Sequence, residues 1–442
     1  MGVMGGILEI VGANAAWMDP VAMLSSSYSA YEVPHSQYYS RSCFDKQNGS
    51  EDVLPSESVK SSRKRKRKKA AYEPNKKEQL AALRHQEARC AILNAHSTFL
   101  ETTYAEISSR EIIDSNTKAP CSEISKVGPL SSTIGSTGCD LDFRQLAEVW
   151  QAPLYELNVL ETNSEKTAKG GPDQGGEEQV SRTYQLFNTL VENVDEEAIA
   201  ECGGAYFLLP RDSQFLISDV SQVHQIIPHN NQDTGSPNPG YNLIVIDPPW
   251  ENKSVQRNSL YPMIPNRQMF SLPIRRLAHS EGALVALWIT NREKLQQFVE
   301  QELFPAWGVK LAATWYWLKL NASGQMISPL DLQHHKPYEC LLLGYLFGQS
   351  QEAATIESAQ EDDTRKVSES QMLYPPEKFV VMSIPGDHSR KPPLGSLLAR
   401  YAPGPRPIRG VELFARELHT GWTSWGNEPL YFQNLKYFQH RV

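Results

Sequence analysis

The chain has 442 residues, of which 40% are apolar and 21% charged, and its formal net charge is −8. This composition is ordinary for a globular protein and leaves room for one large domain with accessory segments. A basic block at residues 63–69 contributes +7, so the rest of the chain carries −15. That balance excludes a protein that coats nucleic acid with a uniformly basic surface, and any nucleic-acid contact must be local.

Cysteine usage and hydropathy narrow the class of protein further. The cysteines are scattered and form no C-x-x-C pair, which argues against a disulfide framework or a structural zinc site. No apolar run approaches the ~18 residues that span a bilayer, and the N-terminus lacks a basic leader. We therefore expect a soluble intracellular protein that binds neither a membrane nor a metal. The six cysteines are Cys43, Cys90, Cys121, Cys139, Cys202 and Cys340.

The N-terminal 72 residues are predicted to comprise a disordered leader and a nuclear-localisation segment. Residues 1–60 are rich in Ser, Gly and Tyr without a sustained period, which predicts disorder. Residues 61–72 contain the basic block, whose density is typical of nuclear import signals. The same block also suits a solvated arm that binds phosphate. We predict the nucleus as the main location, with the cytoplasm as a second.

Residues 73–180 are predicted to be a helical accessory region followed by a linker. Pro74 opens a long helical pattern, since proline is tolerated in a first turn. Its apolar residues recur on one face, and a shorter helix is expected over 142–150. Residues 162–176, with their Gly-Gly pairs, form the predicted boundary before a domain at 181–442. The apolar face of the long helix comprises Ala88, Ile92, Ala95, Phe99 and Ile107.

Two apolar runs open the larger domain. Residues 205–209 and 214–219 are separated by Pro210-Arg211-Asp212-Ser213, which predicts a hairpin or a strand–turn–strand unit. Asp219 and Val220 end the second run. A carboxylate with free backbone groups there suits the adenine edge of a cofactor, whereas Asp is equally common in plain turns.

The central feature is an apolar run at 243–246 that ends at Asp247, Pro248, Pro249 and Trp250. Such a run is typical of a parallel strand buried on both faces, and ligands bind beyond the carboxyl ends of these strands. The prolines leave a stiff loop that offers acceptors rather than amides. Asp247 and the Pro248 carbonyl are therefore suited to grip an exocyclic amine on a ring, with Trp250 or another aromatic stacked on the base.

Residues 253–276 are predicted to form a lid, and residues 282–346 further strands of the sheet. The first segment is long for a connection, which favours a substrate lid over a passive loop. Strand, helix and strand then alternate over 282–289, 293–303 and 312–318, which favours a mainly parallel sheet. Lys336 is expected to contact substrate phosphate. The adjacent His334 and His335 lack partners at metal-ligand spacing.

The last part of the chain supplies candidate cofactor ligands, although it contains no G-x-G-x-x-G motif. Glu412 lies in a short strand at 410–414, where a carboxylate can accept hydrogen bonds from ribose hydroxyls. Arg416, Asn427 and the backbone of Glu428 extend the predicted ribose shell. Lys391 is suited to a carboxylate as a point charge.

Together these motifs resemble the MT-A type adenine-N6 methyltransferases, which carry the DPPW tetrad found at residues 247–250. The resemblance extends from about residue 205 to the C-terminus. It is strongest to the subgroup called methyltransferase-like protein four. The stretches that carry it, besides the tetrad, are residues 207–210, 215–220, 388–393 and 412–416.

The resemblance implies an α/β fold, Rossmann-like and dependent on S-adenosylmethionine, with a circularly permuted motif order. The catalytic loop then precedes the cofactor strand in the chain. Asp247 is also expected to touch the amino group of the cofactor. The loop at 417–421 is short for the family, which leaves His419 as a weaker candidate. The resemblance assigns cofactor contacts to Asp219, Val220, Lys391, Glu412, Phe414, Arg416, Asn427 and Glu428.

The implied activity is N6-methylation of adenosine in nucleic acid, with RNA favoured and DNA as an alternative. The subgroup is associated with 2′-O-methyladenosine in small nuclear RNA. We expect the chain to act without an obligate partner subunit. The rival hypothesis is a catalytically silent subunit that binds RNA, and the intact tetrad favours the enzyme.

Overall fold

The structure is a computed structural model. It describes residues 6–39, 76–102, 104, 146, 155–160, 180–194, 196–228, 240–251, 263–332, 336–348 and 373–441. The basic segment 61–72, the linker 162–176 and the histidine pair lie outside these residues, as do most of the helix predicted at 142–150 and the first part of the predicted lid.

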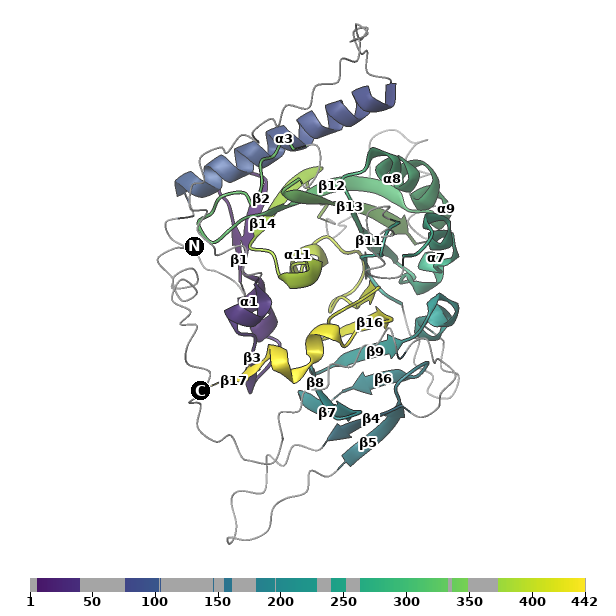
Figure 1. Ribbon diagram of the computed structural model, residues 1–442. Coiled ribbons are helices and arrows are strands. Elements are labelled where there is room, and N and C mark those ends of the chain that lie inside the picture. Colours follow the sequence, from purple (N-terminus) through teal and green to yellow (C-terminus); the bar gives the residue numbers. More distant parts are fainter. Residues whose placement is uncertain are drawn as a thin grey trace, which may run out of the picture.

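Eleven strands form one mixed sheet in the order β1-β2-β14-β12-β13-β11-β10-β15-β16-β9-β6 (Figure 1). Six of its ten strand pairs are parallel, so the predicted α/β class with a mainly parallel sheet is confirmed. The strands are β1 Ile7–Glu9, β2 Ala15–Met18, β6 Leu190–Asn193, β9 Ser213–Ile217, β10 Leu243–Ile246, β11 Gly282–Ile289, β12 Lys310–Lys319, β13 Tyr338–Phe347, β14 Lys378–Ser383, β15 Gly410–Leu413 and β16 Trp422–Gly426.

Both faces of the central strands are covered. Ile244 and Ile246 of β10 pack into the apolar core on one side, while Leu243 and Val245 pack into the core on the other. This explains the continuous apolar run, because a strand buried on both faces has no solvent side. The first core is completed by η4 (Asn266–Ser271), α7 (Ile274–Leu277), α8 (Glu293–Phe298), η5 (Val299–Leu303) and α9 (Phe304–Trp307), and the second by α11 (Gly395–Ala399).

The two strands predicted at 282–289 and 312–318 exist, but they are not neighbours in the sheet. β11 and β12 are separated by β13, which runs antiparallel to both. A strand that enters later in the chain can take that place, and the local sequence pattern carries no sign of it.

The two apolar runs at the start of the larger domain form strands in different sheets. β8 (Ala205–Leu209) belongs to a four-stranded antiparallel sheet in the order β5-β4-β7-β8, and β9 belongs to the central sheet. The unit is therefore a strand–turn–strand and not a hairpin. The small sheet lies at the bottom of Figure 1, with β4 at Glu156–Leu160, β5 at Val180–Gln185 and β7 at Ala198–Cys202.

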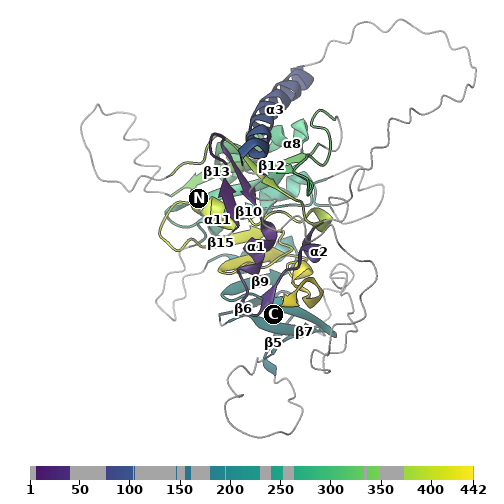
Figure 2. The same ribbon diagram turned by 90° about the vertical axis from the view of Figure 1, so that its left-hand side faces the viewer.

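The prediction of disorder for residues 1–60 is wrong for residues 6–39. β2 pairs in parallel with β14, and β1 extends this edge of the sheet. α1 (Pro20–Ser25) and α2 (His35–Tyr38), both labelled in Figure 2, follow, and β3 (Tyr31–Glu32) pairs with the C-terminal β17 (Gln439–His440), which is labelled beside it in Figure 1. No local pattern marks these strands, because they are short and the partners of β2 and β3 in β14 and β17 lie hundreds of residues away. The central sheet therefore also draws on residues before 181, the predicted domain boundary.

The long helix predicted after Pro74 is α3 (Lys76–Thr102), which crosses the top of Figure 1. Ala88, Ile92, Ala95 and Phe99 are all buried, as their spacing predicted, whereas Ile107 lies outside the described residues. Phe99 stacks on Trp17 of β2 with ring centroids 5.3 Å apart. The helix therefore covers the β12–β14–β2 end of the central sheet.

Candidate active site

The order of the strands places a crevice between β10 and β15. Both are parallel neighbours, but the chain continues outward from β10 to β11 and, much later, from β15 to β16 in the opposite direction. Such a reversal is the place where open α/β sheets bind ligands, at the carboxyl ends of the strands. Asp247 follows β10 and Phe414 follows β15, so the two flank this crevice.

The tetrad after β10 forms a tight acceptor loop. The Asp247 N–H donates to the Leu413 carbonyl oxygen at 3.3 Å, and the Trp250 N–H donates to the Pro248 carbonyl oxygen at 2.8 Å. The Trp250 ring is 7% exposed and its indole N–H donates to the Trp288 carbonyl oxygen at 2.8 Å. Trp250 is therefore a core residue that anchors the loop, and the expectation that its ring stacks on a base is not met.

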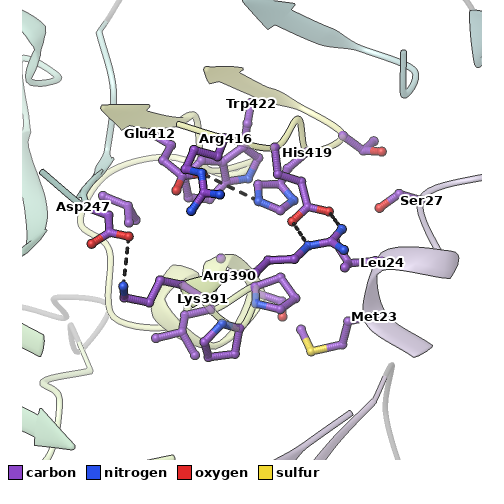
Figure 3. A pocket seen from close by; sticks show the side chains of 18 of the residues that line it. Met23, Leu24, Ser27, Asp247, Arg390, Lys391, Glu412, Arg416, His419 and Trp422 are labelled. Atoms are coloured by element: carbon purple, nitrogen blue, oxygen red, sulfur yellow. Dashed lines mark hydrogen bonds and ion pairs between the residues drawn. The ribbon is translucent and has the colours of Figure 1, made fainter. Parts of the chain in front are cut away.

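A cavity of about 500 Å³ opens beside Asp247 (Figure 3). Its walls come from the ends of β10 and β15, from the segment before α11 and from α1, where Met23, Leu24 and Ser27 face inward. The residues predicted from the sequence that line it are Asp247, Lys391, Glu412, Phe414, Arg416 and His419.

Lys391 is held by two carboxylates. Its Nζ lies 3.1 Å from Asp247 Oδ2 and 3.2 Å from Glu339 Oε2, and Glu339 also forms an ion pair with Lys319. These two carboxylates are its partners among the described residues, and the contact of Lys391 with a cofactor carboxylate stays a prediction. Burial raises the pKa of Asp247, and Lys391 opposes that rise. Burial also acts to raise the pKa of Glu339, but the two lysines outweigh it and lower this pKa to about 2.

Glu412 lies in β15 and faces the cavity. Burial, with the charges of Asp247 and Glu417, raises its pKa to about 8. His419 Nε2 lies 3.6 Å from Glu412 Oε2, and burial lowers the pKa of this imidazole. Phe414 has a φ of 63°, a left-handed conformation that turns the chain sharply at the end of β15. The weaker candidate His419 is thus part of the cavity.

Four predicted cofactor residues lie at the same edge of the sheet but do not line the cavity. β9 and β16 run parallel to β15, so Asp219, Val220, Asn427 and Glu428 follow strands that end beside it. Asp219 is the N-cap of η3 (Val220–Ile226), and its carboxylate accepts from the Ser221 N–H at 2.7 Å and the Ser221 hydroxyl at 2.5 Å. Its side chain thus has the turn role that the sequence left open.

Lys336 lies away from this cavity. Its Nζ is 2.9 Å from His85 Nδ1 of α3 and 3.5 Å from the Tyr338 hydroxyl, in a separate cavity of about 410 Å³ under α3. Burial lowers the pKa of Lys336. The predicted phosphate contact is not visible in this position, because the ammonium faces the accessory helix.

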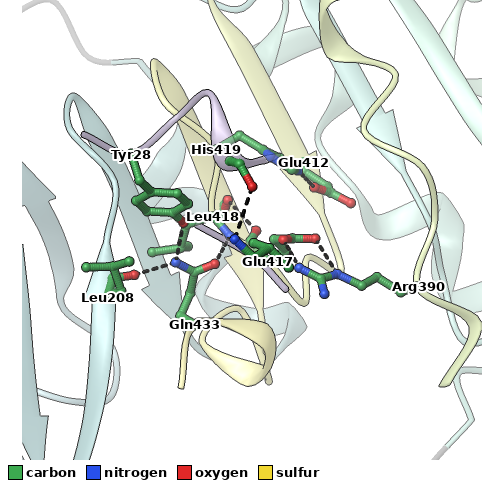
Figure 4. A network of polar contacts seen from close by, with 11 residues as sticks. Tyr28, Leu208, Arg390, Glu412, Glu417, Leu418, His419 and Gln433 are labelled. Atoms are coloured by element: carbon green, nitrogen blue, oxygen red, sulfur yellow. Dashed lines mark hydrogen bonds and ion pairs between the residues drawn. The ribbon is translucent and has the colours of Figure 1, made fainter. Parts of the chain in front are cut away.

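The sequence did not single out the buried pair of Arg390 and Glu417. The guanidinium binds the carboxylate through two nitrogens, and it lies 4.5 Å from the Tyr38 ring centroid and 4.3 Å from that of Phe432. Figure 4 shows this pair beside the neighbouring Leu418, whose N–H donates to Gln433 Oε1 at 3.1 Å. Arg390 belongs to a motif stretch, but nothing local pointed to Tyr38.

Arg390 Nη1 and the Thr420 hydroxyl oxygen are buried in the cavity wall and have no hydrogen-bond partner among the described residues. Buried polar groups without partners are rare in proteins, and they commonly mark the place where a ligand or a water molecule binds. The wall is therefore built to receive a polar ligand.

The part of the chain that the structure describes contains neither a candidate metal centre nor a candidate membrane-spanning helix. There, no three His, Cys, Asp or Glu side chains are grouped so that they can hold a metal ion. Nor is any helix there long and apolar enough to cross a membrane.

Known proteins resemble this chain over the same region. The chain is 36% identical over 311 residues, 69% of its length and 60% of the relative's, to the N(6)-adenine-specific methyltransferase METTL4 of Mus musculus. It is 34% identical over 241 residues to the N6-methyladenosine RNA methyltransferase MTA1 of Pyricularia oryzae, which covers 52% of this chain and 56% of that one. For the DNA N6-methyl methyltransferase of Caenorhabditis elegans the values are 31% over 255 residues, 57% and 59%.

The chain thus spans little more than half the length of these curated relatives. The family model for MT-A70 matches residues 241–428, which begin two residues before β10 and end two residues after β16. These residues contain the tetrad, the cavity strands and the Lys391 segment. Through them, the chain belongs to the MT-A70 family and resembles its METTL4 members.

Proposed function

We propose that this chain transfers a methyl group from S-adenosylmethionine to the N6 amine of adenine in nucleic acid. The observation that carries the proposal is the acceptor loop of Asp247 and Pro248 at the crevice between β10 and β15, with a polar cavity beside it. The names of the relatives agree with adenine-N6 chemistry.

The acceptors address the main chemical difficulty of this reaction. The lone pair of an adenine amine is delocalised into the ring, so the nitrogen is a weak nucleophile. Asp247 Oδ2 is occupied by Lys391, which leaves Oδ1 for one N–H of the amine. The Pro248 carbonyl accepts one bond from Trp250 and keeps a second lone pair for the other N–H. Two such bonds favour a pyramidal nitrogen that is aimed at the methyl donor.

The cavity fits the proposed cofactor. Its volume of about 500 Å³ lies in the range of ligand pockets, roughly 300–1,000 Å³. The buried donors Arg390 Nη1 and the Thr420 hydroxyl await a polar partner, and Glu412 and Arg416 stand beside them. When bound, S-adenosylmethionine supplies a methyl group already activated on a sulfonium. We assign its ribose and adenine to the edge formed by Asp219, Val220, Asn427 and Glu428.

We also propose that the motif order is circularly permuted. β10 with the acceptor loop comes at residues 243–250, whereas β15 and β16, which carry the cofactor contacts, come at 410–428. The two halves are nevertheless adjacent in the sheet. Their spatial order, rather than their order in the chain, brings the reacting groups together.

The proposed target is RNA, with 2′-O-methyladenosine as the preferred nucleoside on the strength of the subgroup resemblance. The relatives' names include both an RNA and a DNA methyltransferase. We propose that the chain acts alone, without an obligate partner subunit, because its acceptor loop and its cofactor edge are both intact.

Mass spectrometry of nucleosides tests the proposal. The protein is incubated with S-adenosylmethionine and matched RNA, 2′-O-methyl RNA and DNA oligonucleotides, and N6-methylated nucleosides are quantified. We expect the product mainly in 2′-O-methyl RNA. A silent subunit that binds RNA would yield no product with any oligonucleotide, and calorimetry would show no binding of S-adenosylmethionine. Product in DNA alone would transfer the proposal to the DNA alternative.

A further inference from the structure

A chain of four charged side chains runs along the carboxyl edge of the central sheet and ends at Asp247. Lys319 closes β12, and Glu339 opens β13, which runs antiparallel to β11, so both lie at this edge. Lys391 reaches the same place from the segment between β14 and α11. The order is Lys319, Glu339, Lys391, Asp247, and the signs of the charges alternate.

The charged side chains nearest Asp247 are largely buried rather than spread over the surface. The side chains of Lys391 and Glu339 are 14% and 23% exposed, and that of Asp247 is 26% exposed. The Lys391 ammonium also lies 5.5 Å from the centre of the Trp288 ring. Its two carboxylate distances, 3.1 Å and 3.2 Å, are nearly equal. The ammonium is therefore shared between Asp247 and Glu339.

We propose that Glu339 is a positioning residue for the methyl transfer: it holds the Lys391 ammonium and takes part of its charge, so that Asp247 remains a strong acceptor for the target amine. This inference rests on the proposed function. It concerns a residue that does not line the described cavity and acts through Lys391.

The charge on the target nitrogen explains why sharing matters. The amine gains positive charge as its lone pair forms the bond to the methyl carbon. The bond from that carbon to sulfur breaks and leaves its electron pair on sulfur, and the methylated nitrogen then loses one N–H proton to solvent. An Asp247 carboxylate stabilises this charge through its hydrogen bond. An ammonium that faced Asp247 alone would oppose that stabilisation, since charges at these distances interact strongly in a partly buried site. Glu339 attracts the Lys391 ammonium and so reduces its effect on Asp247.

The other charged groups that face Asp247 set the background for a pH test. They are Arg416 from the segment after β15, whose charge lowers the pKa of Asp247, and Glu412 of β15, with which Asp247 interacts. Glu339 itself acts to raise the pKa of Asp247. Loss of its charge should therefore let Asp247 ionise at lower pH.

The experiment measures single-turnover rates against pH at saturating cofactor for the wild type and Glu339→Gln. We expect the plateau rate to fall about tenfold, less than for a group that touches the amine itself. The acid limb of the profile should move to lower pH. A residue with a merely structural role would lower the rate without moving that limb, and this outcome overturns the inference, as does a wild-type profile.

A binding measurement gives a readout that needs no turnover. S-adenosylmethionine carries one positive charge more than S-adenosylhomocysteine, and Glu339→Gln adds one positive charge to the site. Calorimetry gives the dissociation constant of S-adenosylmethionine divided by that of S-adenosylhomocysteine. We expect this ratio to be about three- to tenfold higher for Glu339→Gln than for the wild type. An unchanged ratio contradicts charge sharing.

Two more variants guard the interpretation. Lys319→Gln removes one of the two ammonium groups on Glu339, so Glu339 can take more of the Lys391 charge. The acid limb of the pH profile of Lys319→Gln should therefore move to higher pH. A shift to lower pH, or no shift, refutes the inference even if Glu339→Gln does not fold. Glu377→Gln is the matched control, since this exposed carboxylate precedes β14 at the opposite edge of the sheet. A wild type without activity on any oligonucleotide would count against the proposed function, while the binding ratio would still test Glu339.

Discussion

At the scale of single residues, three carboxylates share one edge of the sheet but differ in how their protons are held. Burial raises the pKa of Asp247 and raises that of Glu412 to about 8. Two lysines lower that of Glu339 to about 2. A carboxylate is favoured when opposite charges lie close and disfavoured when water is removed. This edge of the sheet therefore holds one firmly ionised carboxylate, Glu339, and two carboxylates whose ionisation responds to their surroundings.

Asp247→Asn tests the acceptor role directly. The amide places an N–H donor or a weaker acceptor where the carboxylate oxygen stood, and it lacks the charge that stabilises the reacting nitrogen. We expect the single-turnover rate at saturating cofactor to fall roughly 30- to 1,000-fold, or about 2–4 kcal/mol of barrier. Circular dichroism checks that the fold is retained. Wild-type rates in a folded variant would mean that the tetrad is only a structural turn.

Glu412→Gln tests the raised pKa through stability. A Glu ionises near pH 4.5 when unfolded, but Glu412 does so near 8 in the folded chain. Between these values the folded state holds the proton that the unfolded state has lost, so the contribution of Glu412 to stability falls as pH rises. At pH 9 the variant, without cofactor, should be about 2–4 kcal/mol more stable than the wild type, with little difference near pH 5. Urea unfolding at both pH values measures this, and parallel curves would contradict it.

At the scale of elements, α3 shows most clearly which features follow from local sequence and which from tertiary packing. Its apolar spacing predicted which residues are buried, but not that it covers the β12–β14–β2 end of the sheet. The contacts that dock the helix include the stack of Phe99 on Trp17 and a hydrogen bond between His96 Nε2 and the Gly324 carbonyl oxygen at 2.8 Å. The helix is thus part of the main core, and packing of its apolar face, rather than its own helix propensity, stabilises it there.

Phe99→Ala should therefore destabilise the whole fold. The side chain is fully buried, and removal of such a ring leaves a cavity that typically costs about 3–5 kcal/mol. Leu93→Ala is the matched control on the same helix, because Leu93 is 38% exposed, and we expect a loss below about 1 kcal/mol. Denaturant midpoints compare the two. Equal losses would show that α3 is not docked through its Phe99 face.

At the scale of the whole molecule, the two ends of the described chain are joined. β3 pairs with β17, Tyr28 accepts a hydrogen bond from Gln433 at 3.0 Å, and Tyr38 packs on Arg390 in the cavity wall. The small sheet of β4, β5, β7 and β8 packs through its own apolar core against the segment around Leu418. Residues before 40 thus help to support the candidate site.

The basic block at residues 63–69 lies outside the described residues and remains a proposal for nuclear import. Replacement of the block with alanines should move a fluorescent fusion from the nucleus to the cytoplasm. The purified variant should methylate a short oligonucleotide as the wild type does, since the block is not part of the site. Unchanged nuclear fluorescence would refute the import role, and a slower reaction would favour the alternative of a phosphate-binding arm.

By itself, the sequence determined the elements whose signal is local. The apolar run before Asp247 predicted β10, the spacing of Ala88 to Phe99 predicted the buried face of α3, and the tetrad with residues 388–393 and 412–416 predicted the site. These features follow from side-chain periodicity and from residues close together in the chain.

Only the tertiary structure decided which partners these residues have. Trp250 is drawn into the core, Lys391 is shared by Asp247 and Glu339, and Lys336 faces α3. Residues 6–39 complete a sheet whose other strands begin far along the chain. The reason is physical: burial and ion pairing depend on distance in space. These partners lie between 38 and 251 residues apart in the chain, so they carry no joint signal until the fold brings them together.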